Sequence, residues 1–285
     1  MSKEQKKWLS IALAAVLAVG LFMIVRRELG IRQSERDNAD AAQVAGLEKE
    51  TEPTTAPPAT EPATEPPTEP ETEPLPPLPE EAAQLAELDL EALRAENPDV
   101  VGWILIPDTE VNYPIMQGED NQYYLEHTWK GEYSAAGSIF LECKNDPSLE
   151  GFHTLIYGHR MKNNSMFGSI KFYSQKEYWE EHPSVYIAFD GGIYRYDIFT
   201  AQEVGIREIV YYLDFEGREQ DFIDFCLEHS ELDTGIVPTV EDRFITLSTC
   251  TGQGHDTRWT VQAVLGQAEF DTANILTEQE EDQEP

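Results

Sequence analysis

The stretch Arg243-Phe244-Ile245-Thr246-Leu247-Ser248-Thr249-Cys250 decides how this chain is interpreted, because an apolar run typical of a buried strand ends there in a cysteine. After the polar residues 251–257, the chain resumes as Arg258-Trp259-Thr260-Val261-Gln262-Ala263-Val264-Leu265, with apolar side chains at alternate positions. Two such runs around a short polar loop predict neighbouring strands. A thiol therefore ends one strand and a guanidinium begins the next. A nearby cation favours thiolate, the nucleophilic form of cysteine; a buried cysteine beside a surface arginine would give the same local pattern.

The folded part of the chain is predicted to be mainly β. Helices are expected over residues 80–96, 174–182 and 216–230, and the last of these precedes the cysteine strand. Asp190-Gly191-Gly192 predicts a tight hairpin. Besides the two strands above, the strand-like runs are 101–106, 137–141, 152–157, 185–189 and 193–204. Short strands with few helices indicate a closed or half-closed β-barrel.

The N-terminus is predicted to anchor the chain in a membrane. Residues 8–25 carry no charge and would span about 27 Å as a helix, just enough to cross a bilayer. The run is long for a cleaved signal peptide, and Arg26-Arg27 directly after it is a poor cleavage context. We therefore expect a transmembrane signal-anchor over 8–25, with residues 1–7 cytoplasmic and residues 26–50 as a juxtamembrane segment.

A Pro/Glu/Thr-rich stretch separates this anchor from the folded part. Residues 51–80 hold 11 of the 18 prolines and have almost nothing to bury, which predicts a disordered, extended stalk. Such a spacer suits a folded domain outside the cell, so we expect a single-pass protein of the cell membrane with a cytoplasmic N-terminus and an extracellular domain. We assign residues 81–270 to that domain and residues 271–285 to an acidic disordered tail.

Composition argues against several functions. The net charge of −34 at pH 7 excludes nucleic acid as an expected partner, because phosphate binding needs a basic patch. No run resembles an EF-hand loop, and no metal site is predicted. The three cysteines are an odd number, which indicates a free thiol rather than a disulfide scaffold. Cys226 is expected to be buried on a helix, and Cys143 follows a strand without an evident partner.

A cysteine nucleophile needs a proton partner, and two of the six histidines stand in a suitable context. His255 is close to Cys250 in sequence but lies in a flexible-looking, glycine-containing loop. His159 follows the strand that ends at Tyr157. Because a rigid strand positions a catalytic group better than a loop does, the sequence favours His159.

Thr246-Leu247-Ser248-Thr249-Cys250 with Arg258, together with Tyr157-Gly158-His159, resembles the active site of sortases, the transpeptidases of Gram-positive cell surfaces. The likeness extends over about residues 97–265, and its motifs occur in the order found in class B members. The other stretches that resemble class B are Val101-Gly102-Trp103-Ile104, Asn112-Tyr113-Pro114-Ile115-Met116-Gln117, Asp120-Asn121, Tyr123-Tyr124-Leu125 and Gly137-Ser138-Ile139-Phe140-Leu141. The predicted stalk and tail are not covered by it.

The resemblance implies a sortase-type eight-stranded β-barrel, with an N-terminal helix and a helix inserted before the catalytic-cysteine strand. It also implies a mechanism. Cys250 would attack the carbonyl carbon of a threonine in a C-terminal sorting signal, giving a thioacyl-enzyme. His159 would protonate the departing amine and later accept a proton from the incoming one. Arg258 would bind the oxyanion, substrate carbonyls or the thiolate, and the sequence leaves these roles open.

By the same resemblance, Asn121 and Leu125 would line the groove for the sorting signal, with Tyr157, Ser248 and Thr249 beside the catalytic groups. The partners would be secreted proteins bearing the signal and an amino group of a peptidoglycan precursor. This chemistry requires no metal and no organic cofactor. The signal sequence, the acceptor amine, the choice between wall anchoring and pilus assembly, and the oligomeric state stay open.

Two other functions fit part of the pattern. A cysteine peptidase that releases the acyl group to water would use the same residues and differ only in its acceptor. A non-catalytic wall-binding barrel would need none of Cys250, His159 and Arg258, yet all three are present.

Overall fold

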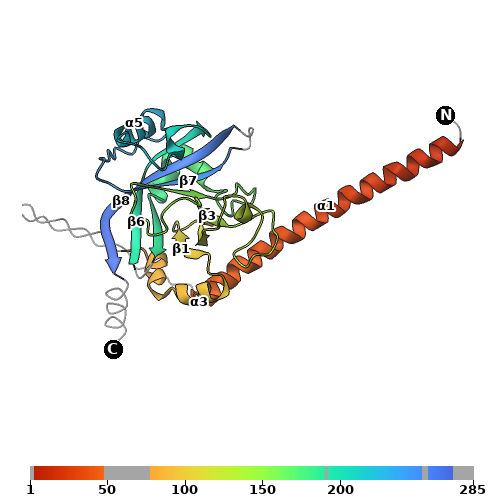
Figure 1. Ribbon diagram of the computed structural model, residues 1–285, viewed down its shortest axis with the longest axis horizontal. Coiled ribbons are helices and arrows are strands. Elements are labelled where there is room, and N and C mark those ends of the chain that lie inside the picture. The colour runs from red at the N-terminus through yellow and green to blue at the C-terminus, as the bar shows by residue number, and fades with distance from the viewer. Residues whose placement is uncertain (1–2, 48–77, 190–191, 252–255, 272–285) are drawn as a thin grey trace, which may run out of the picture.

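The protein is built around a closed β-barrel (Figure 1), seen in a computed structural model that describes residues 3–47, 78–189, 192–251 and 256–271. The strands are β1 (Val100–Leu105), β2 (Asn112–Met116), β3 (Ile139–Leu141), β4 (His153–Tyr157), β5 (Ser184–Phe189), β6 (Gly192–Gly205), β7 (Phe244–Cys250) and β8 (Thr257–Asp271). Around the barrel they follow the order β1-β2-β3-β4-β7-β8-β6-β5. The predicted mainly β, eight-stranded barrel is confirmed.

Two strand pairings set the position of the residues on either side of the barrel rim. β4 and β7 are parallel, in register from His153 opposite Phe244 to Tyr157 opposite Ser248. β7 and β8 are antiparallel and pair Cys250 with Arg258. Because parallel strands end at the same edge of a sheet, the residues that follow β4 emerge beside the end of β7.

The barrel interior is filled by branched apolar side chains. Alternation along a strand sends every second side chain to one face, and each of the eight strands contributes to one buried cluster. Its members include Ile104, Ile115, Ile139, Ile156, Ile187, Ile198, Leu247 and Val261. Outside the barrel, a second apolar layer forms where helix α5 (Glu219–His229), inserted before β7, lays Phe222 and Cys226 against Phe244. Cys226 is fully buried, as expected.

The structure corrects two of the expected elements. Strand β2 was not among the runs expected from their pattern, since Pro114 lies within it and proline is rare inside strands. The helix expected over 80–96 is divided into α2 (Glu80–Ala83), a 3₁₀ turn η1 (Gln84–Glu87) and α3 (Leu90–Glu96). The division has a local cause, because Asp89 begins a new helix by accepting a hydrogen bond from the backbone N–H of Ala92 at 2.9 Å. Helix α4 (Lys176–Glu181) lies within the range predicted for it.

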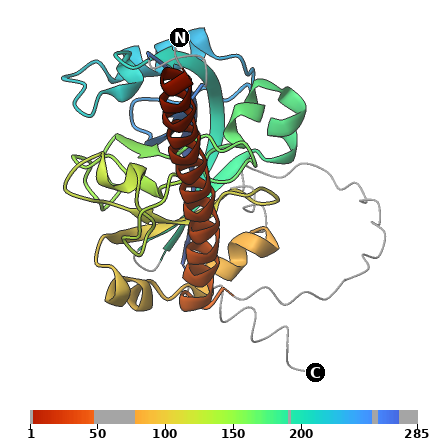
Figure 2. The same ribbon diagram turned by 90° about the vertical axis from the view of Figure 1, so that its right-hand side faces the viewer.

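Helix α1 (Lys3–Val44) precedes the barrel and is continuous through the predicted anchor and most of the juxtamembrane segment. Its N-terminal half projects away from the barrel and contains an 18-residue window that is apolar and long enough to cross a membrane. Its C-terminal half runs along the barrel (Figure 2), where Ser34, Asp37, Ala41 and Ala45 are at most 3 % exposed. Leu47 and Leu78 pack against the same apolar cluster as Ala41 and Ala45.

Most of the predicted stalk and the tail over 272–285 lie outside the described residues, as do the hairpin residues 190–191. The stalk and the tail therefore stay predictions. The strands on either side of that hairpin, β5 and β6, pair antiparallel as expected, with Phe189 opposite Gly192.

A buried histidine links β4 to the outer apolar layer. His153 donates from Nδ1 to the carbonyl of Tyr212 at 3.0 Å and accepts at Nε2 from the hydroxyl of Thr246 at 2.8 Å. Its ring packs against Phe215 and Phe222. Burial lowers the pKa of His153 from 6.5 to about 4, although the bond to Tyr212 opposes the shift.

This shift predicts acid-sensitive stability. The unfolded chain binds a proton on His153 below about pH 6.5, whereas the folded protein does not until about pH 4, so the stability that the neutral imidazole contributes is lost as pH falls through that window. The loss amounts to about 3 kcal/mol between pH 7.5 and 4. Denaturant unfolding at several pH values should show a steeper decline for the wild type than for His153→Gln. Parallel pH profiles for the two proteins would contradict this assignment.

Candidate functional site

A pocket of about 280 Å³ lies at the rim where β4 and β7 end, and all the residues singled out in the sequence line it. The catalytic candidates among them are His159, Cys250 and Arg258, and the substrate-binding candidates are Asn121, Leu125, Tyr157, Ser248 and Thr249. Phe140 and Gly158 complete the lining, and the sequence had not assigned either a role in the site. The pocket therefore gathers residues from β3, β4, β7, β8 and the turn η2 (Tyr123–Leu125).

Cys250 and Arg258 face each other across the β7–β8 pairing. Cys250 is a free thiol and only partly buried, so its sulfur is open to a ligand in the pocket. Arg258 is held on one side by its own strand, since Nη1 donates to the carbonyl of Thr257 at 2.8 Å. A guanidinium this close to a thiol favours the thiolate electrostatically.

A tyrosine that the sequence did not single out closes the pocket beside these two residues. Tyr211 belongs to the turn η4 (Ile209–Tyr211), and its hydroxyl hydrogen bonds to Ser248 Oγ at 2.9 Å. Burial raises the pKa of Tyr211 to about 12, with the charge of Arg258 lowering it and that of Cys250 raising it. Tyr211 is therefore neutral at physiological pH and lies within electrostatic range of both catalytic candidates.

Alternation along β7 separates the two residues that precede the cysteine. Ser248 lies on the same face as Cys250, whereas Thr249 lies on the face of Ile245 and Leu247, which fill the barrel interior. Thr249 is 2 % exposed, and its hydroxyl is buried without a partner among the described residues. We therefore expect Ser248 to present its side chain to the pocket and Thr249 to contribute main chain.

His159 is fixed by the backbone around it. Its Nε2 is 2.8 Å from the carbonyl of Leu125, and because a carbonyl only accepts, Nε2 carries the proton. Gly158 gives the ring close access to the barrel, since a Cβ there would collide with the side chains of Ile139 and Phe167. Among the described residues, no hydrogen bond joins His159 to Cys250. The alternative base, His255, lies outside the described residues.

The opposite wall of the pocket is organised by a buried carboxylate. Glu142, which directly follows β3, is 8 % exposed and accepts from Asn121 Nδ2 at 2.5 Å and from the Tyr157 hydroxyl at 3.0 Å. Asn121 Oδ1 in turn accepts from the backbone N–H of Cys143 at 2.8 Å. Burial and the Glu142 charge raise the pKa of Tyr157, which keeps the hydroxyl protonated. The only sequence signal for Glu142 was an acidic residue at the end of an apolar strand.

Nothing in the described part of the chain suggests a metal centre. No group of three or more His, Cys, Asp or Glu side chains there is placed to hold an ion. The pocket instead combines a thiol, an imidazole and a guanidinium with a largely apolar lining, which is a set suited to acyl chemistry by a sulfur nucleophile.

Comparison with known proteins agrees with this chemistry. A family model described as the Sortase domain matches residues 104–266. Sortase B of Listeria monocytogenes is 36 % identical over 166 residues, and Sortase B of Staphylococcus aureus is 33 % identical over 162 residues. These alignments cover 57 % and 56 % of this chain and 67 % and 66 % of the relatives, so the likeness spans about two thirds of their length.

Solved structures give the same picture. A Staphylococcus aureus sortase B–substrate complex is 31 % identical with a TM-score of 0.58, covering 62 % of this chain and 83 % of that one. A mutant form of Clostridium perfringens sortase B is 28 % identical with a TM-score of 0.60, covering 66 % and 91 %. The family model spans more than half of the chain, and the relatives that match it share one class. The chain therefore belongs to the sortase family of cysteine transpeptidases, in class B.

Proposed function

We propose that this protein cleaves a C-terminal sorting signal after a threonine and transfers the released acyl group to an amino group of a peptidoglycan precursor. One observation carries the proposal: Cys250, His159 and Arg258, chosen from sequence, line a single pocket with the other candidates. The substrate class is supported by relatives, because one Staphylococcus aureus structure is described as a sortase B–substrate complex and another holds sortase B complexed with triglycine.

In the first half of the reaction, the Cys250 thiolate attacks the threonine carbonyl carbon, and the carbonyl electron pair moves to oxygen. Arg258 stabilises this oxyanion, because it stands across the strand pairing from the sulfur. As the intermediate collapses, the carbon–nitrogen bond breaks and His159 gives a proton to the departing amine. Since Nε2 is engaged by the Leu125 carbonyl, Nδ1 is the nitrogen that exchanges this proton.

In the second half, an incoming amine attacks the thioacyl carbon. His159 accepts the proton that this amine loses, the new amide forms, and Cys250 leaves as thiolate. Asn121 and Leu125 line the groove for the signal, and Tyr157 and Ser248 frame the reacting groups, with Thr249 contributing main chain. The apolar N-terminal half of α1 would hold the enzyme in the cell membrane, with residues 81–270 as an extracellular catalytic domain.

The central prediction concerns the thioacyl intermediate. The full chain in detergent, incubated with a library of x-Pro-x-Thr-x peptides and an amine, should form a covalent adduct on Cys250 that passes to the amine, as followed by intact-mass spectrometry. Cys250→Ala should form none, and His159→Ala should slow turnover by about 100- to 10,000-fold, the usual contribution of a positioned acid–base group.

The controls separate the rival functions. His255→Ala should leave turnover near wild type, and loss of activity in that variant would transfer the proton role to His255. Adduct that goes to water despite ample amine would identify a peptidase instead. A wild-type protein that binds peptides without any adduct would identify a non-catalytic barrel.

A further prediction tests the Glu142 wall. Glu142→Gln replaces one acceptor oxygen by an N–H group, so either Asn121 or Tyr157 loses its partner. We expect kcat/KM to fall roughly tenfold, which corresponds to about 1.4 kcal/mol, with KM rising because the groove is misaligned. Glu126→Gln, the same change at an exposed position on the other side of η2, should have no effect. Equal kcat/KM values for both variants and wild type would remove Glu142 from the site.

A further inference from the structure

The C-terminal half of α1 has a buried face with the spacing of a packed helix. Ser34, Asp37, Ala41 and Ala45 recur at intervals of three and four residues and are at most 3 % exposed. Ala41 and Ala45 belong to an apolar cluster with Trp103 and Trp129, against which Leu125 and Tyr157 of the pocket also pack. This face of α1 is therefore continuous, through packed side chains, with the wall of the active site.

Hydrogen bonds fasten this face to the segment 127–138. The indole N–H of Trp129 donates to the carbonyl of Asp37 at 2.5 Å, and Ser134 Oγ donates to the carbonyl of Gly30 at 2.9 Å. Lys130 pairs with Asp40 at 2.8 Å. These contacts alternate between main chain and side chain of α1, so they fix the helix both along its axis and around it.

The same segment supports the carbonyl that orients the catalytic histidine. Ser138 N–H donates to the Tyr124 carbonyl at 2.9 Å, next to the Leu125 carbonyl that accepts from His159. Gly137 has a φ of 57°, and a Cβ there would lie 2.6 Å from the Leu125 oxygen. There is consequently little room for segment 127–138 to shift without moving Leu125.

Helix α1 also contacts the loop that follows His159. Asn163 Nδ2 donates to Glu35 at 3.2 Å, and Asn38 Nδ2 approaches Met166 Sδ at 3.9 Å. The next residue, Phe167, donates its N–H to the His159 carbonyl at 3.0 Å. Two separate segments that hold His159 thus rest on one helix.

We propose that the C-terminal half of α1 is a positioning element of the active site, which sets the orientation of His159 through segments 123–138 and 160–167. The inference rests on the proposed function, because it takes His159 as the catalytic acid and base. It adds a role for the helix that carries the apolar N-terminal window: the part of α1 next to the barrel aligns the proton-transfer group as well as connecting the barrel to the anchor.

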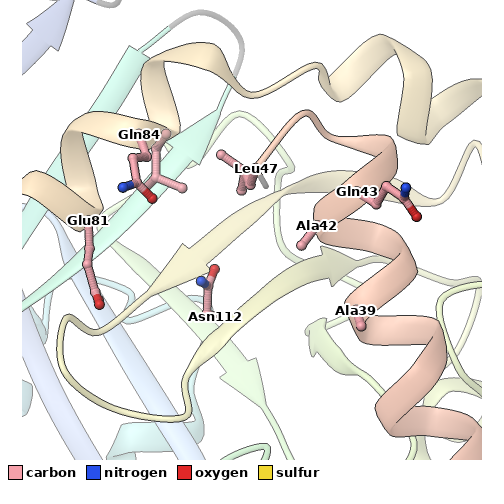
Figure 3. A pocket seen from close by; sticks show the side chains of 8 residues that line it. Ala39, Ala42, Gln43, Leu47, Glu81, Gln84 and Asn112 are labelled. Carbon is pink, nitrogen blue, oxygen red and sulfur yellow. The ribbon is translucent and has the colours of Figure 1, made fainter. Parts of the chain in front are cut away.

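A neighbouring position on α1 provides a matched control. Ala39 is exposed and lines an open groove of about 410 Å³ between α1 and the α2–η1 turn (Figure 3), which has room for a longer side chain. Ala41, two residues on, is fully buried. The same substitution at these two positions therefore differs in whether it disturbs the docked face.

The experiment compares Ala41→Arg with Ala39→Arg in the full chain, reconstituted in nanodiscs. Hydrogen exchange is measured on residues 123–138 and 159–167, together with peptide turnover and the pH profile of Cys250 alkylation. For Ala41→Arg we expect faster exchange in both segments, a displaced alkylation profile and a fall in kcat of about 10- to 100-fold, as misplacement of a catalytic group produces. Ala39→Arg should match the wild type in all three.

A second variant guards against simple unfolding of the first. Trp129→Phe keeps an aromatic ring in the cluster but removes the N–H that donates to Asp37, and it should reproduce the effects of Ala41→Arg in weaker form without lowering the melting temperature substantially. The proposal is overturned if either variant releases α1 while exchange in both segments and the alkylation profile stay at wild-type values. Failure of the wild type to turn over any peptide would instead refute the proposed function, and the exchange and alkylation data would still test the role of α1.

Discussion

The parallel pairing of β4 with β7 is the constraint on which the rest of the site depends. Its register, with Tyr157 opposite Ser248, places the residue two positions beyond β4 beside the residue two positions beyond Ser248. Backbone hydrogen bonds along five paired positions maintain that alignment, so the imidazole and the thiol need not bond to each other to stay close. The antiparallel β8 then adds Arg258 from the other side.

Around this frame, polar side chains outside the barrel are paired rather than left open to solvent. Glu142 collects hydrogen bonds from Asn121 and Tyr157, and Tyr211 bonds to Ser248. A buried carboxylate is tolerated only where donors compensate its lost hydration, so these partners both stabilise Glu142 and restrict their own rotamers. Preorganisation of this kind lowers the reorganisation needed when charge develops on a substrate.

The sequence predicted the parts of this site that are written locally. Cys250, His159 and Arg258 stand at strand ends that alternation and turn residues reveal, and the motifs around them carry the family resemblance. Strand β2 was missed because Pro114 contradicts the usual pattern of a strand. Glu142 and Tyr211 were missed for a different reason: their roles exist only through partners that are distant in sequence, and no local pattern encodes such contacts. The burial of Ser34 and Asp37 on α1 is likewise a property of packing.

The places where Leu47 and Leu78 lie have a consequence for how the chain can vary. Both side chains pack on one apolar cluster, so the chain leaves the barrel surface after α1 and comes back to the same patch before α2. The separation of these two points is set by packing and is independent of how many residues join them. Lengthening such a connection costs only closure entropy, about 0.6 kcal/mol for each doubling. Insertions, deletions and changes of repeat number between these two leucines can therefore accumulate with little effect on the fold.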